Sequence, residues 1–273
     1  MTVFLVRDET SRPQLAEQIT DILQQLAPIM VETTGLSLAP RVTYRLVTPK
    51  EWRAVQVRGL QRALACDMAD LDLPPERLAQ AHASIKKARV MMLKAWPLVM
   101  GSTGRTAGEQ PETVIAPKAL HHTGLLANDD VLAQMVVHEL VHHAQQTAWD
   151  HHAARWSTLF PDLRGRPHWA FSSLLEGHAR WADQQVTRLA FGAPVDADRT
   201  RKSQSLRYRL HARLPGIRNA GPSRAAYDAG AQFIEHIVAA GGTDLINRIW
   251  KDSDLVPTHS EITDAEAWLL RVG

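Results

Sequence analysis

The chain has 273 residues, of which 45% are hydrophobic and 22% are charged. This composition is ordinary for a globular protein and excludes a disordered or low-complexity chain. Lysine and arginine (31) nearly balance aspartate and glutamate (29), so the formal charge is +2, and no whole-protein nucleic-acid surface is indicated. The single cysteine, Cys66, excludes an internal disulfide and a cysteine-rich metal site.

The sequence shows neither a signal peptide nor a segment apolar enough to cross a membrane. Residues 1–12 carry charged side chains and lack the apolar region of a signal peptide. The most apolar stretch, Val90–Met100, contains Lys94 and Pro97 and is much shorter than the roughly 20 residues of a membrane span. We therefore expect a cytoplasmic protein with no membrane segment.

Periodicity predicts a mostly helical chain with two short strands. Val42–Val47 alternates apolar and polar residues, which is typical of a strand, and Thr113–Ile115 is a second, shorter candidate. The glycine-rich segment Gly101–Pro111 is expected to be a loop. Helices are predicted from the spacing of apolar residues and from Pro, Ser, Thr, Asn and Asp at helix starts, over residues 13–29, 49–70, 75–96, 168–191, 225–240, 244–250 and 264–271. A further helix is predicted to begin near Asp130.

The chemistry is concentrated in residues 138–142, which read HELVH. On a helix His138 and His142 lie one turn apart on one face, where two imidazoles can bind one zinc ion. Glu139 between them is then placed to act as general base toward a zinc-activated water. No glycine or proline occurs from Val131 to Asp150, which favours an uninterrupted helix.

A catalytic zinc takes a third protein ligand, and Glu176 is the candidate. It lies in the apolar helical stretch His168–Phe191, where an unpaired carboxylate is unfavourable. Gly177 directly after it is unfavourable inside a helix, and a close helix–helix approach would explain its presence. A salt bridge from Glu176 to Arg180 one turn later is the alternative, and spacing alone does not decide between them.

These segments resemble a known family. HELVHH and LLEGHARWAD are similar to the metal-binding segments of gluzincin-type zinc metallopeptidases, in which a glutamate from a second helix joins the two histidines. Together with the segment from Tyr227 to Phe233 and the C-terminal LVPTHSEITDAEAWL, they resemble the zincin-like metallopeptidase type 2 family, which is labelled as associated with deazaflavin-coenzyme biosynthesis. The resemblance covers about Val131–Gly273.

The resemblance implies one zinc ion per chain, with His138, His142 and Glu176 as ligands and Glu139 as general base. It implies an α+β fold, mostly helical and zincin-like, with a small sheet before the active-site helix. We divide the chain into an N-terminal subdomain, residues 1–111, and a catalytic core with a C-terminal helical part, residues 112–273, packed as one unit. If Thr113–Ile115 is the edge of the sheet, a peptide substrate could add to it as a strand.

Other polar residues near these motifs are weaker candidates. In gluzincin-like enzymes a tyrosine or histidine often stabilises the oxyanion, and Tyr227 is a candidate for this role, with a half-buried core tyrosine as the alternative. Asp183 could orient a ligand imidazole, although we favour a solvated aspartate. We treat His178 as a non-ligand. We also treat as non-ligands three histidines that belong to adjacent pairs, because helix neighbours point about 100° apart: His143, His151 and His152.

The function predicted is therefore hydrolysis of peptide bonds, with a peptide or protein as partner and no nucleic acid. The alternative is a zinc-binding regulatory or assembly protein that keeps a gluzincin core without hydrolysis. A third possibility is an acidic-partner or nucleic-acid binder that uses the basic stretch Arg199–Arg224, for which a solvated, ion-paired face is the simpler interpretation.

Overall fold

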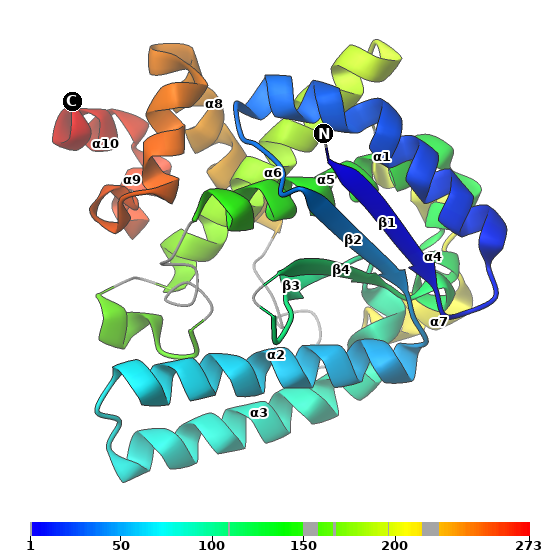
Figure 1. Cartoon of the computed structure of the whole chain (residues 1–273), viewed down its shortest axis with the longest axis horizontal. Helices are drawn as coiled ribbons and strands as arrows, with labels where there is room; N and C mark the ends of the chain where they lie inside the picture. Colours follow the sequence, from blue (N-terminus) through cyan, green and yellow to red (C-terminus); the bar gives the residue numbers. More distant parts are fainter. Residues whose placement is uncertain (1, 109, 150–157, 166–167, 196, 215–223) are drawn as a thin grey trace.

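A small mixed sheet with helices on both faces forms the centre of the protein (Figure 1). The computed structural model describes residues 2–108, 110–149, 158–165, 168–195, 197–214 and 224–273. Within these residues the strand order is β1-β2-β4-β3. Strands β1 (Val3–Asp8), β2 (Arg41–Leu46) and β4 (Pro111–Ile115) are parallel, and β3 (Thr103–Arg105) is antiparallel to β4. The expected fold class, mostly helical α+β with a small sheet before the active-site helix, is confirmed.

The edge of the sheet differs from the expectation. β2 and β4 match the two predicted strands, but β4 lies between β2 and β3 and is not an edge. The edge strand beside β4 is β3, inside the segment that we expected to be a loop, and β1 is the other edge. A three-residue strand with a central glycine, Gly104, has no periodicity of its own and exists because Thr103 pairs with Thr113 across the ladder.

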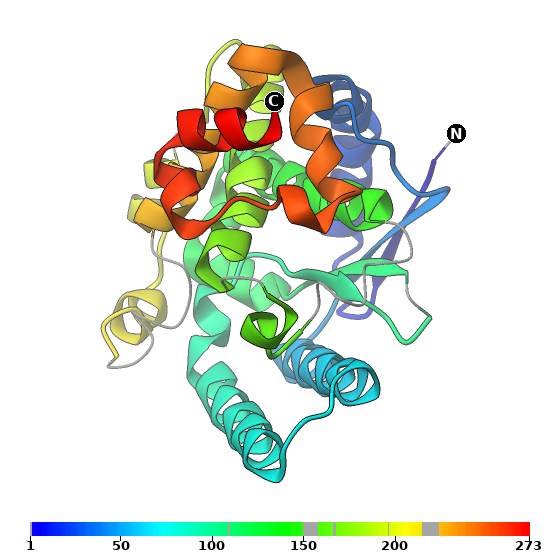
Figure 2. The same cartoon turned by 90° about the vertical axis from the view of Figure 1, so that its left-hand side faces the viewer.

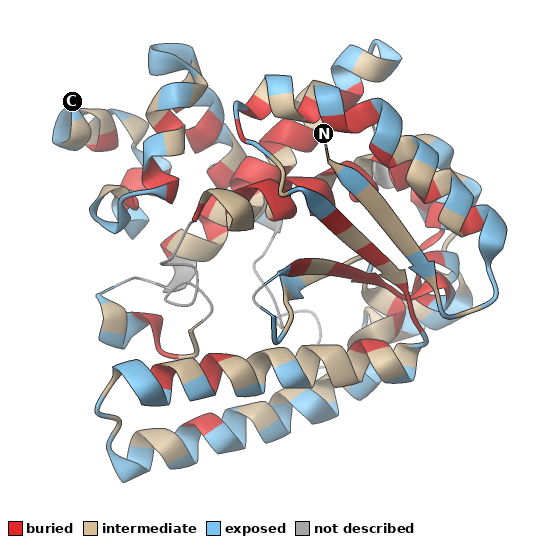
Figure 3. Cartoon of the chain, viewed as in Figure 1, coloured by how far each residue is buried: buried red, intermediate tan, exposed pale blue. Residues whose placement is uncertain are grey.

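One face of the sheet packs on a helical layer that contains the active-site motif. Helix α1 (Pro13–Thr34) connects β1 to β2 and runs through Pro28 without ending there. Helices α5 (Asp129–Ala148) and α6 (His168–Phe191) complete the layer, and buried residues concentrate where these helices meet the sheet (Figure 3). The Tyr44 hydroxyl donates to the Val136 carbonyl at 2.9 Å and thereby ties β2 to α5.

The opposite face of the sheet is covered by a helical hairpin, α2 (Pro49–Asp70) and α3 (Pro75–Ala95) (Figures 1 and 2). Thr48 caps α2 by accepting the Glu51 N–H, as its Ser/Thr-type start predicts. Trp52 packs against Val114 of β4. α3 buries only Ala81 and lies mainly in solvent, so this hairpin adds little to the main core (Figure 3).

The C-terminal helices pack on α6. α8 (Arg224–Asn247) has the closest association with α6, and α9 (His259–Thr263) and α10 (Ala265–Val272) follow it. Gly242, with φ +73°, interrupts α8 between the two helices that the sequence predicts. The division near residue 111 stays a prediction. Shorter helices are α4 (Pro117–Thr123) and α7 (Leu206–His211), with 3-10 turns at 96–98, 125–127, 161–164, 197–202, 248–250 and 253–255.

None of the helices in the described part of the chain has both the length and the apolar character needed to cross a bilayer.

Candidate metal centre

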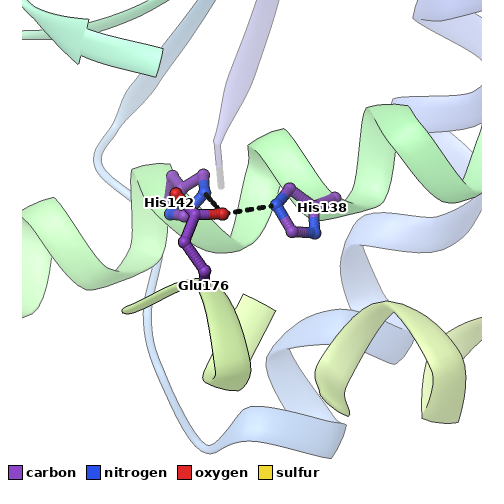
Figure 4. Close-up of side chains that lie close together, drawn as sticks. All are labelled: His138, His142 and Glu176. Atoms are coloured by element: carbon purple, nitrogen blue, oxygen red, sulfur yellow. Dashed lines mark hydrogen bonds and ion pairs between the residues drawn. The ribbon is translucent and has the colours of Figure 1, made fainter. Parts of the chain in front are cut away.

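Helix α5 carries both histidines of the HELVH motif on one side. Its opposite side is buried through Val136, Leu140 and Ala144, which follow one another at helical spacing and anchor the helix in the core. The imidazole rings of His138 and His142 have centroids 5.0 Å apart and stand almost perpendicular to each other. The motif is therefore helical as expected, with both rings directed to the same space (Figure 4).

Glu176 enters this space from α6 (Figure 4). Its Oε2 atom lies 3.2 Å from Nε2 of His138 and 3.6 Å from Nε2 of His142. One donor atom from each of the three side chains falls within 4.8 Å of the other two. Arg180, the other partner considered for Glu176, instead forms an ion pair with Asp228 at 2.8 Å. Two nitrogens and one carboxylate oxygen are a donor set that zinc accepts.

The far side of each imidazole is fixed by an acceptor. Nδ1 of His138 is 2.9 Å from Oδ2 of Asp183, and Asp183 also accepts from Gln134 at 2.8 Å. Nδ1 of His142 is 2.8 Å from Oε1 of Gln145. Since both acceptors favour a proton on Nδ1, both Nε2 lone pairs are left to face Glu176.

Asp183 corrects our expectation of a solvated aspartate. Its exposed fraction is 4%, and its carboxylate on α6 contacts two side chains of α5, Gln134 and His138. Two of the histidines that we predicted not to bind the metal, His178 and His143, lie in the described residues, and both are buried. His178 lies near Gln145, with Nδ1 3.1 Å from its amide nitrogen, and His143 is directed toward β4. His151 and His152 lie outside the described residues.

Glu139 is held by the edge of the sheet. The Thr103 hydroxyl donates to Oε2 of Glu139 at 2.5 Å, and Thr103 Oγ1 is 2.6 Å from Thr113 Oγ1. Thr113 Oγ1 is 2.9 Å from Nε2 of His143. Because a carboxylate only accepts, the chain runs from His143 N–H through Thr113 and Thr103 to Glu139.

Two features keep Glu139 close to the edge strand. Its exposed fraction is only 6%. A Cβ atom on Gly101 would lie 2.7 Å from Oε1 of Glu139, so a larger residue there would displace the Glu139 carboxylate from its present position. The base candidate is therefore tightly enclosed between α5 and β3.

The environment shifts several pKa values. Burial alone would raise the pKa of Glu176, but His142 and His138 lower it well below its usual range. Burial lowers the pKa of His143 to about 3 and that of His178 to about 3, so both are neutral. Burial, together with the carboxylates of Glu176 and Glu139, raises the pKa of Tyr227, so its phenol keeps its proton.

Tyr227 belongs to the same cleft. The cleft has a volume of about 750 Å³ and is lined by β3, α5, α6 and the start of α8. Tyr227 lines it together with Glu139 and Glu176. The phenol and Glu176 come together because Gly177 of α6 and Gly230 of α8 let these two helices touch, which confirms the close approach expected at Gly177.

Sequence reasoning missed three residues around the site. Thr103, Thr113 and Gln145 carry no motif, and their roles depend on pairing between segments far apart in the chain. Asp183 was considered because it follows Glu176 by seven residues and therefore shares its helix face, and of its two interpretations the orienting role is the one that the structure supports.

Residues 169–269 match the profile of a family described as zincin-like metallopeptidases. The expected resemblance is confirmed. The matched region contains Glu176, Asp183 and Tyr227, and it begins after the HELVH motif. The match supports a hydrolase of the peptidase kind and implies a metal, with zinc as the expected ion.

A solved structure from Chloroflexus aurantiacus, named a "putative hydrolase with a novel fold", is similar over nearly the whole chain. The TM-score is 0.63 at 16% identity, and the similarity covers 96% of this chain and 91% of the other. At this identity the likeness shows a shared fold alone. No curated protein sequence matches the chain.

The basic stretch Arg199–Arg224 is partly described, since residues 215–223 lie outside the described part. Arg199 forms an ion pair with Asp130, and the Arg207 guanidinium lies 5.0 Å from the Trp96 ring centre. Both arginines therefore contact other residues of the same chain, which favours the interpretation of an ion-paired face over a surface for a nucleic acid or an acidic partner.

Proposed function

We propose that the protein is a zinc-dependent peptidase that hydrolyses peptide bonds with Glu139 as general base. The observation that carries this proposal is the convergence of two Nε2 atoms and one carboxylate oxygen within 4.8 Å beside Glu139. Both Nδ1 atoms are already engaged by Asp183 and Gln145, so the imidazoles are oriented for a ligand that requires lone pairs. We assign His138, His142 and Glu176 as the zinc ligands.

Zinc held by these side chains would lower the pKa of a bound water molecule and polarise the scissile carbonyl group. Glu139 would accept a proton from the attacking water and deliver it to the leaving amine nitrogen. The Thr103 hydroxyl, which donates to Oε2, holds the carboxylate in one orientation for both transfers. Tyr227 keeps its phenolic proton and would donate it as a hydrogen bond to the oxyanion of the substrate.

The edge strand β3 supports a peptide as substrate. Val114 N–H donates to Ser102 O and Thr106 N–H donates to Gln110 O, so these alternate residues of the β3 segment point their main-chain groups toward β4. The main-chain N–H and C=O groups of Thr103 therefore point away from β4, toward the open side of β3, and Thr103 itself contacts Glu139. An extended peptide added along β3 would pass directly in front of the proposed base.

The test is cleavage of an unbiased peptide library by zinc-loaded protein, read by mass spectrometry beside Glu139→Gln. We expect cleavage by the wild type and none by the variant, with zinc content equal in both. Equal cleavage by both proteins would exclude Glu139 as the base.

A non-hydrolytic zinc protein is the second candidate, and one observation favours it. Glu139 is only 6% exposed and its carboxylate is already bound by Thr103, which is what a permanently covered site would also show. Absence of cleavage from the library, combined with loss of folding on removal of zinc, would support this candidate.

A further inference from the structure

A second cavity lies on the other side of the edge strand. It has a volume of about 380 Å³ and is enclosed by α2 and by the face of β3 and β4 that does not carry the metal centre. Gln56, Gly59 and Ala63 of α2 line it at helical spacing. The metal cleft and this cavity share the residues 102–104, so one strand separates them. We call it the arginine cavity, after Arg45, Arg58, Arg62 and Arg105, which line it.

Two glycines keep the arginine cavity open. A Cβ atom on Gly104 of β3 would meet no atom within 4 Å. A Cβ atom on Gly59 of α2 would meet only a nitrogen of Arg62, at 3.9 Å. Backbone therefore forms the walls at both positions, and space for a side chain remains between them.

Two of the arginines that line the cavity have carboxylate partners among the described residues. Arg45 binds Glu9 and Glu112, and Arg58 binds Glu51 at 2.6 Å.

Arg62 donates to the main-chain carbonyl of Arg105, an acceptor that carries no formal charge. Among the residues that the structure describes, no carboxylate forms an ion pair with Arg62. A guanidinium has five N–H donors, so Arg62 retains donors for a second acceptor.

The register of β3 connects this cavity to a bound peptide. Side chains of directly opposed residues in adjacent strands lie on the same face of a sheet. In the ladder with β4, Gly104 faces the same side as Glu112, which lines the cavity, while Thr103 faces Glu139. A peptide residue opposite Gly104 would therefore direct its side chain into the arginine cavity, one residue away from the one beside Glu139.

We propose that the arginine cavity binds a carboxylate of the peptide substrate through Arg62; this rests on the proposed function. A carboxylate is the acceptor that matches a guanidinium in geometry and charge. It has two sources. A peptide antiparallel to β3 presents an acidic side chain on the N-terminal side of the scissile bond. A parallel peptide presents a residue on the C-terminal side, where the terminal carboxylate can also reach Arg62.

The experiment measures binding, so that it does not depend on turnover. The probes are labelled octapeptides of alanine and valine. In one series a single glutamate occupies each internal position in turn, and each glutamate peptide has a neutral twin with glutamine at the same position. The neutral parent, which has neither residue, is made with a free C-terminal carboxylate and with a C-terminal amide. Their affinity for zinc-loaded Glu139→Gln is measured by fluorescence anisotropy. We expect one glutamate position, or the free acid, to bind about tenfold more tightly than its neutral twin, which corresponds to about 1.4 kcal/mol.

Adding Arg62→Gln should remove this preference and leave the affinity of the neutral parent within about twofold. Gly104→Val should also remove the preference between each glutamate peptide and its glutamine twin, because it fills the cavity with Arg62 in place, and it tests the proposal independently if Arg62→Gln lowers folding. Lys50→Gln, on the same helix but away from the cavity, should keep the preference.

Equal affinity for all twins, or a preference that survives Arg62→Gln, would overturn the assignment. Failure of the wild type to cleave the neutral parent and the library would instead count against the proposed peptidase function, and the binding comparison would still decide on the cavity.

Discussion

A Cβ atom on Gly177 would lie 2.5 Å from the Cα atom of Gly230, so α6 and α8 cross with their backbones in contact. Glu176 is the neighbour of Gly177, and Tyr227 is one helical turn before Gly230. The crossing therefore sets the distance between the proposed third ligand and the proposed oxyanion donor. A larger residue at either glycine must separate the two helices.

Gly177→Ala is expected to lower the free energy of unfolding by about 3 kcal/mol or more, because the added methyl meets main-chain atoms that cannot move aside. It should also weaken zinc binding through displacement of Glu176. Urea unfolding and zinc titration check both effects. Gly59→Ala in the open part of α2 is the matched control and should be neutral or stabilising by about 0.5–1 kcal/mol. Equal stability of the two variants would contradict the crossing.

The active-site helix and the third-ligand candidate could be predicted from sequence because both signals are local. The spacing of His138 and His142 needs only a helix, and the apolar surroundings of Glu176 make a solvated carboxylate unfavourable at that position. The family match over 169–269 agrees with this reasoning on the second helix.

The sheet could be predicted only in part, because short strands depend on their partners. β1 ends in charged residues at the start of the chain, and β3 is three residues around Gly104; neither has a pattern that distinguishes it from a loop. Because β3 was not predicted, the sequence left open whether Thr113–Ile115 is an edge, and the structure shows that it is not. The solvated interpretation of Asp183 was wrong because sequence does not reveal that Gln134 and His138 of another helix face it.

Glu176→Ala is expected to reduce zinc affinity strongly, because it removes one of the three proposed ligands. Asp183→Asn should reduce it by about 10–100-fold, since the acceptor that orients His138 is weakened while all three ligands remain. Competition with a chelator of known affinity measures both, and circular dichroism confirms folding. Zinc affinity of Glu176→Ala equal to that of the wild type would exclude the third-ligand assignment.

Thr113→Val interrupts the hydrogen-bond chain between His143 and Glu139 with almost no change in shape. The buried N–H of His143 loses its acceptor, so a loss of stability of about 1–3 kcal/mol is expected. Because Thr103 loses the donor that orients its hydroxyl toward Glu139, kcat should fall about tenfold with KM and zinc content unchanged. Thr113→Ser keeps the hydroxyl and should restore kcat. A serine variant as slow as the valine variant would show that packing, not the hydrogen-bond chain, is responsible.

Asp67→Asn is expected to destabilise the attachment of the α2–α3 hairpin. The carboxylate is fully buried and accepts from Arg164, from the Thr158 hydroxyl and from the Leu159 main chain. Breaking a buried ion pair on one side costs about 3–5 kcal/mol. Asp70→Asn is the control, because Asp70 binds the same Arg164 at 3.0 Å from an exposed position and should contribute under about 1 kcal/mol. Thermal unfolding of both variants makes the comparison, and similar losses would contradict it.

The C-terminal helices should lose stability in acid through Glu261. Its side chain accepts from Arg271 at 2.7 Å and completes the capping box with Thr258 at the start of α9. The hydrogen bond from Arg271 lowers the pKa of Glu261 despite the opposing effect of burial. A carboxylate whose pKa is lower in the folded state stabilises the fold above its unfolded pKa of about 4.3, and this stabilisation disappears as the pH falls through the lower folded value.

Glu261→Gln should therefore be less stable than the wild type by about 1–2 kcal/mol at pH 7. The difference in the free energy of unfolding between the two proteins should become smaller as the pH is lowered below about 4. Urea unfolding of the pair at each pH measures it, with Glu235→Gln on the exposed side of α8 as a control that should show no comparable pH-dependent difference. A difference between Glu261→Gln and wild type that stays constant down to pH 3 would mean that Glu261 acts through shape and not through its charge.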